Sequence, residues 1–136
     1  MAMKLGHVTS KGGAEHWATQ LHTHGHDLVA DELPPHGGDQ GPTPFGYLLS
    51  GLAACTNITL RMYADRKGWP LEEVAVECTF VREGEGDAAV DHIDRVLRLT
   101  GDLDDEQRAR LADIAERTPV TLVTKRGTDV RTTVAA

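Results

Sequence analysis

Residues 45–60, FGYLLSGLAACTNITL, contain no charged side chain and are apolar or small on nearly every face of a helix. A helix of this kind is normally buried on all sides instead of lying on a protein surface. Thr43 suits the N-cap position and Pro44 the first helical position, while Gly68 stops the pattern. We therefore predict a buried helix that runs from Pro44 to Lys67.

One short chain has difficulty covering such a helix. The chain has 136 residues, of which 4% are aromatic, and this length fits a single domain covering residues 1–136. Small side chains at Ser50, Gly51, Ala53 and Ala54 would let a second helix approach closely. Because a monomer would leave a large apolar surface in water, we predict a homodimer.

Composition and charge exclude several classes of partner. Hydrophobic residues make up 40% and charged residues 26% of the chain, as in globular proteins. The net charge of −7 repels phosphate backbones, so we expect no nucleic-acid partner. No window reaches the roughly 18 apolar residues of a membrane span, and the N-terminus lacks an apolar signal segment. We expect a cytoplasmic protein with no membrane partner.

Alternating polar and apolar residues predict strands on both sides of the helix. The predicted strands cover residues 4–7, 14–22 and 27–31 before it, and 74–81 and 93–99 after it. Asp104 and Gln107 resemble a capping box, which opens a second helix ending near Pro119. Residues 120–125 and 128–134 are expected to be extended. The predicted order is βββ-α-ββ-α-β, in the α+β class.

Two cysteines, Cys55 and Cys78, are too few for a disulfide framework or for a zinc site made of cysteines alone. Cys55 shares its helix face with Leu48, Leu52, Thr59 and Met62. It is therefore either a core side chain or a nucleophile. A nucleophilic thiolate would need a cation from elsewhere in the chain, since burial alone disfavours the ionised form, and no arginine precedes Arg61. Cys78, in an alternating strand, is interpreted as structural.

Three histidines occupy alternate positions in the sequence HTHGH: His22, His24 and His26. On one face of a strand they could chelate a divalent metal. Gly25 is expected to turn the chain before His26, so an exposed hairpin is the preferred interpretation. We expect neither a metal nor a cofactor.

Residues 30–77, ADELPPHGGDQGPTPFGYLLSGLAACTNITLRMYADRKGWPLEEVAVE, resemble the signature region of the OsmC/Ohr family of thiol-dependent organic hydroperoxide reductases. The resemblance is greatest to the OsmC-like branch and continues through residues 93–120. It implies an α+β fold in which two chains intertwine as a homodimer and bury their central helices between two sheets.

The resemblance also implies a chemistry. Cys55 matches the cysteine that attacks the peroxide and becomes a sulfenic acid. The resolving cysteine of the family's C-P-V motif is replaced by Thr118, and the glutamate near the start of the central helix by Gly46. The arginine that the Ohr branch places over the thiolate is also missing.

The resemblance implies reduction of an organic hydroperoxide through Cys55, and without a resolving cysteine this would be a one-cysteine reaction in which an external thiol regenerates Cys55. Without a cation, oxidation should be slow and should accelerate from about pH 7 to about pH 9. Two alternatives stay open, namely a small-molecule-binding protein that has lost catalysis and a structural module with an inert core thiol.

Overall fold

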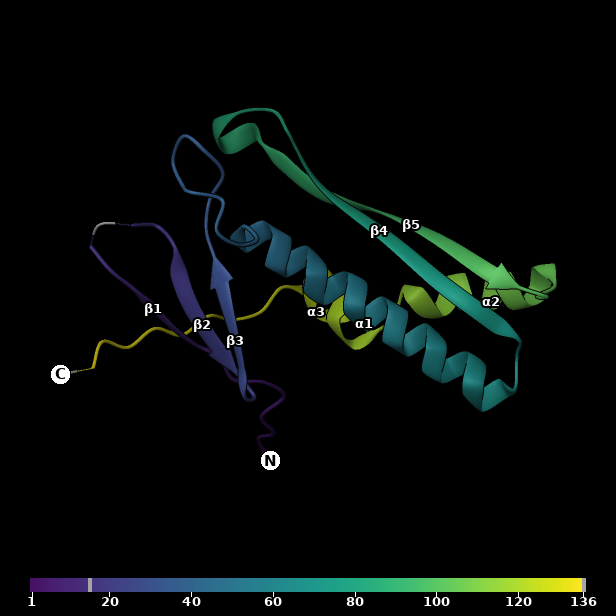
Figure 1. The fold of residues 1–136 in the computed structure, drawn as a ribbon. Coiled ribbons are helices and arrows are strands. Elements are labelled where there is room, and N and C mark those ends of the chain that lie inside the picture. The colour runs from purple at the N-terminus through teal and green to yellow at the C-terminus, as the bar shows by residue number, and fades with distance from the viewer. Residues whose placement is uncertain (15, 136) are drawn as a thin grey trace. The chain divides into compact units, whose positions relative to one another are not determined.

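The computed structural model describes residues 1–14 and 16–135. The chain divides into two compact units, Met1–Leu48 and Leu49–Ala136. The long helix α1 (Pro44–Lys67), drawn in Figure 1, begins in the first unit and continues into the second. Its residues Leu60 and Ala64 belong to the hydrophobic core of the second unit. A single domain covering residues 1–136 stays a prediction.

The first unit contains a three-stranded antiparallel sheet in the order β1-β2-β3. Its strands are β1 (Thr9–Gly12), β2 (Thr19–Thr23) and β3 (His26–Ala30). His24 and Gly25 connect β2 to β3 with positive φ angles of 48° and 80°. Two positive φ angles match the twist of a tight hairpin, so the turn expected at Gly25 is confirmed.

The first strand was predicted at residues 4–7, and this is wrong, because β1 begins at Thr9. In the register of the sheet, Gly12 pairs with Thr19 and Thr9 pairs with His22. β2 ends at Thr23, where the chain turns. Residues 4–7 therefore lie beyond the end of their pairing strand and have no ladder to join.

The loop between β3 and α1 is organised by Asp31, which is 3% exposed. Its carboxylate accepts hydrogen bonds from the backbone N–H groups of Glu32, Gly38 and Gln40 at 2.7, 3.2 and 3.1 Å. These bonds, with that from Glu32 foremost, hold the pKa of Asp31 below its ordinary value. One buried carboxylate thus fixes the Pro- and Gly-rich loop that leads into α1.

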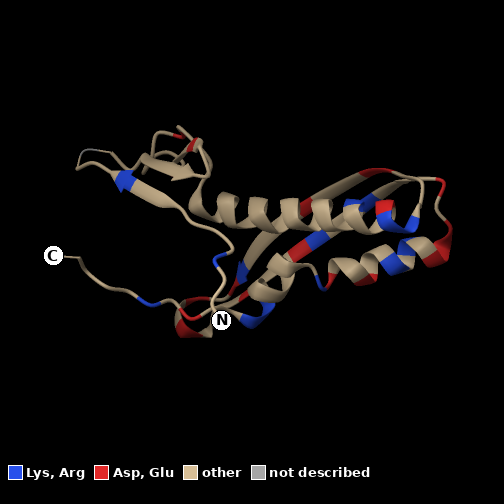
Figure 2. Ribbon diagram, turned by 90° about the horizontal axis from the view of Figure 1, so that it is seen from below, with Lys and Arg blue, Asp and Glu red and all other residues tan. Residues whose placement is uncertain are grey.

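The bounds predicted for α1 are confirmed. The Thr43 hydroxyl caps the helix by accepting a hydrogen bond from the N–H of Gly46 at 3.0 Å. Gly68 ends it with a φ of 69°, a conformation that a residue without Cβ adopts readily. Charged side chains occur only toward its C-terminal end (Figure 2).

The second unit packs helices against an antiparallel hairpin of β4 (Leu71–Glu83) and β5 (Val90–Gly101), joined through the 3-10 turn η1 (Gly86–Ala88). α1 and the helices α2 (Asp105–Ala115) and α3 (Pro119–Arg126) lie on one side of this hairpin (Figure 1). The buried core consists of Leu60, Ala64, Leu71, Val74, Leu103, Leu111 and Ala115. The predicted α+β class is confirmed.

The C-terminal region differs from the predicted extended structure. The predicted capping box opens α2, with Asp104 and Gln107 bonding reciprocally. Residues 120–125, however, belong to the helix α3, and residues 128–134 have neither helix nor strand. The Thr118 hydroxyl caps α3 by accepting a hydrogen bond from the N–H of Thr121 at 3.2 Å. The observed order is therefore βββ-α-ββ-α-α.

Candidate functional site

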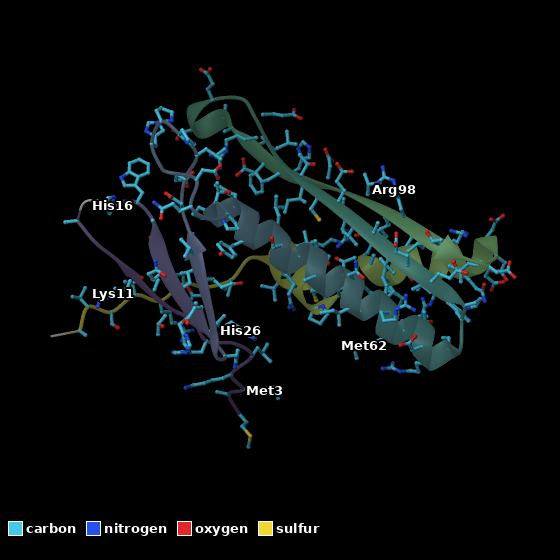
Figure 3. The ribbon with its side chains drawn as sticks, in the orientation of Figure 1. Met3, Lys11, His16, His26, Met62 and Arg98 are labelled. Atoms are coloured by element: carbon cyan, nitrogen blue, oxygen red, sulfur yellow. The ribbon has the colours of Figure 1, made fainter. Side chains whose placement is uncertain are left out.

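Cys55 lies near the middle of α1 and is half-buried, at the border between two rows of side chains. The buried row consists of Leu52, Thr56, Leu60 and Ala64. The opposite row includes Ile58 and Met62, which are 60% and 56% exposed. Met62 projects away from the β4–β5 hairpin (Figure 3). The chain on its own therefore buries one face of α1 and leaves an apolar face open, and burial on all sides, which was predicted for a dimer, stays a prediction.

The Cys55 sulfur has a hydroxyl as its neighbour. Its Sγ lies 3.9 Å from the Oγ1 of Thr59, one turn further along α1. Within residues 1–14 and 16–135, no lysine, arginine or histidine forms a hydrogen bond with this sulfur. The side-chain partner of this sulfur in the chain is therefore a neutral hydroxyl.

Cys78 lies on β4 directly opposite Arg95 of β5 and is also a free, half-buried thiol. Burial raises the pKa of the Cys78 thiol above its ordinary value, and the nearby Arg95 charge opposes that rise. Cys78 is thus held mainly as the neutral thiol, which is the poorer nucleophile. The structural role inferred from the sequence for Cys78 stays a prediction.

Thr118, at the position of the family's resolving cysteine, is completely buried. Its hydroxyl caps α3 and lies 2.6 Å from the Oγ1 of Thr121. Gly46, at the position of the family's glutamate, lies in the first turn of α1 and donates its N–H to the cap formed by Thr43. These two positions therefore serve helix capping and supply neither a sulfur nor a carboxylate.

Arg95 is a largely buried residue that was not predicted from the sequence as part of the site. Its side chain is 13% exposed. Nη1 donates to the hydroxyls of Thr56 and Thr121 at 3.0 and 2.9 Å. Nη2 donates to the Ala115 carbonyl at 2.8 Å and to Oε2 of Glu116 at 3.2 Å. One guanidinium from β5 therefore ties together α1, the end of α2 and α3.

The three histidines lie in and beside the turn between β2 and β3. His22 Nδ1 lies 2.7 Å from Oδ1 of Asp27, its partner across the β2–β3 hairpin, and His24 occupies the turn. Among the residues that the structure describes, no three His, Cys, Asp or Glu side chains are grouped closely enough to hold a metal ion. None of the described helices is long and apolar enough to span a membrane.

This fold and the half-buried thiol on its long helix define an α+β protein with one cysteine at a candidate active site. The family model for OsmC-like proteins matches residues 37–133. The chain therefore belongs to the OsmC-like protein family. A comparison with curated proteins found no match.

Solved structures share the fold. An OsmC-like protein from Mycoplasma pneumoniae is 19% identical, with 90% of this chain and 88% of that chain covered and a TM-score of 0.77. An organic hydroperoxide resistance protein OsmC from Legionella pneumophila is 19% identical, with 92% of each chain covered and a TM-score of 0.70. The organic hydroperoxide resistance protein OhrB of Bacillus subtilis is 21% identical, with 91% and 93% covered and a TM-score of 0.64.

Proposed function

We propose that this protein is a thiol-dependent hydroperoxide reductase with Cys55 as the attacking residue and an external thiol as the reductant. The observation that carries the proposal is the half-buried Cys55 thiol on the central helix of an OsmC-like chain. The names of two structural neighbours, both organic hydroperoxide resistance proteins, support the same class of substrate.

The proposed reaction has two stages. The Cys55 thiolate attacks one oxygen of an organic hydroperoxide, so that an S–O bond forms, the O–O bond breaks and an alcohol leaves after taking up a proton. An external thiol then displaces water from the sulfenic acid and forms a mixed disulfide. A second external thiol releases Cys55 as a thiol, and the two external thiols leave as their disulfide.

The surroundings of the other candidate groups support an external reductant. Thr118 carries a hydroxyl, which cannot form a disulfide, and this hydroxyl is engaged with Thr121 in the core. Cys78 lies on the β4–β5 hairpin, and burial raises the pKa of its thiol. A sulfenic acid at Cys55 would therefore persist until it reacts with a thiol from solution.

Mass spectrometry of the oxidised protein tests this chemistry. After treatment with an organic hydroperoxide, we expect Cys55 as a sulfenic acid, and after addition of a small thiol such as 2-mercaptoethanol we expect a mixed disulfide at Cys55. Cys78 should stay a free thiol, as it is in the structure. A disulfide between Cys55 and Cys78 of one chain, or no modification of Cys55, would contradict the proposed reaction.

We also propose that the protein is a homodimer, because the open face of α1 carries large apolar side chains such as Ile58 and Met62. Sedimentation equilibrium at micromolar concentration should give twice the mass of the chain. Ile58→Glu should shift the protein to monomers or unfold it, whereas Thr100→Glu, an exposed change on β5, should leave the mass unchanged. A folded monomer of the unaltered protein would contradict the proposal.

A second candidate function is a small-molecule-binding protein that keeps the fold without catalysis. It is favoured by the neutral surroundings of the Cys55 sulfur, whose partner is the Thr59 hydroxyl and not a cation. This candidate predicts that organic hydroperoxides leave Cys55 unmodified, so the mass spectrometry described above separates the two functions.

A further inference from the structure

We infer that Thr59 is a catalytic residue, whose hydroxyl donates a hydrogen bond to the Cys55 sulfur when this sulfur is ionised. The inference rests on the proposed function, because it assigns a second residue to the same reaction. Both side chains are half-buried on α1, and Thr59 Oγ1 lies 3.9 Å from Cys55 Sγ. Residues four apart on a helix face each other across one turn, so this contact is built into the helix.

The direction of the Thr59 hydroxyl distinguishes it from other threonines in the helices. The hydroxyl of Thr56 donates to the carbonyl of Leu52 at 2.7 Å, and that of Thr124 to the carbonyl of Val120 at 2.7 Å. This bond to the carbonyl four residues earlier is the usual choice for a threonine inside a helix. The Thr59 hydroxyl instead has the Cys55 sulfur as its side-chain partner.

Ionisation of Cys55 fixes which atom donates. In the neutral state, either the thiol or the hydroxyl can be the donor. A thiolate has no proton, so the Thr59 hydroxyl must then donate. Hydrogen bonds to an ionised acceptor are shorter and about twice as strong as neutral ones, and long contacts at a resting site commonly tighten in the reacting state.

The contact is important because of what this site lacks. Among the described residues, no cation forms a hydrogen bond with Cys55, and the residue at the glutamate position is Gly46. A hydrogen bond to a charged group is stronger than one between neutral groups. The Thr59 hydroxyl is therefore the group in this chain that is placed to donate to the Cys55 sulfur in the first step.

Alkylation of Cys55 by iodoacetamide, followed by mass spectrometry of the Cys55 peptide, tests the role of Thr59. Thr59→Val removes the hydroxyl with little change in volume, and we expect alkylation about tenfold slower at about pH 7. At about pH 10 the rates should converge, because a neighbouring donor matters little at a pH well above the ordinary range of cysteine thiols. Thr59→Ser keeps a hydroxyl and should alkylate within about twofold of the unaltered protein at both pH values.

Thr124→Val is the matched control, since it removes a helical threonine hydroxyl that bonds to a backbone carbonyl. It should alkylate at Cys55 like the unaltered protein. Equal rates for Thr59→Val and the unaltered protein at about pH 7, or the same slowing at both pH values, would overturn the role of Thr59. Iodoacetamide reports the thiolate without any peroxide, so failure of the proposed peroxidase activity would appear separately, as a Cys55 that alkylates but is not oxidised.

Discussion

Replacing Cys55 by serine should reduce the consumption of an organic hydroperoxide to the uncatalysed background, measured with dithiothreitol as the external thiol. Serine carries no sulfur to oxidise, so the first step of the proposed reaction is lost completely. Cys78→Ser should keep the activity within about twofold, because the thiol at Cys78 faces Arg95 on the hairpin and takes no part in either stage.

The two cysteine variants control for each other. Serine nearly matches the volume of cysteine and can keep a contact with Thr59, so the thermal unfolding midpoint of Cys55→Ser should stay close to that of the unaltered protein. Activity that persists in Cys55→Ser and disappears in Cys78→Ser would show that Cys78, on the β4–β5 hairpin, is the attacking residue. Activity lost in both, with both proteins folded, would show that Cys78 also takes part.

The sequence predicts the central helix to the residue because its end signals are local. Thr43 and Pro44 open α1 and Gly68 closes it, and each acts through its own backbone or through a neighbour within one turn. The capping box of α2 is equally local, with Asp104 and Gln107 three residues apart. Signals of this kind need no knowledge of the rest of the fold.

The helix α3 was missed because its composition conflicts with its end signals. Val120, Thr121, Val123 and Thr124 are β-branched and favour strands. The pair Thr118-Pro119 is nevertheless the same opening signal as Thr43-Pro44, and Gly127, with a φ of 76°, closes the helix. Here the caps and the packing of Thr121 into the core outweigh intrinsic preference.

The candidate site could be predicted only in part. The position of Cys55 on α1 follows from the helix, but the contacts of Arg95 join residues 20 to 39 positions apart in the sequence. No local pattern specifies such contacts. The available signal was a charged residue on the inward side of β5, where Ile93 and Leu97 also lie. A charge on a buried face requires hydrogen-bond partners, which are the groups that α1, α2 and α3 supply.

Replacing Arg95 by methionine should lower the free energy of unfolding by about 3 kcal/mol. The variant removes the donor shared by Thr56, Thr121 and the Ala115 carbonyl, and it leaves these acceptors with fewer partners in a region where the arginine side chain is only 13% exposed. Denaturant titration at one fixed protein concentration measures the change, and a fixed concentration is needed because a dimer's stability depends on it.

Arg98→Met is the matched control for this prediction. Arg98 lies on the same strand, projects to the opposite side of the hairpin (Figure 3) and is 65% exposed, with Glu77 at 3.5 Å as its ion-pair partner. An exposed pair of this kind contributes little, so the control should lose no more than about 0.5 kcal/mol. Equal losses for the two variants would show that the three helices are held on the hairpin by apolar packing, with the Arg95 hydrogen bonds contributing no more than surface contacts.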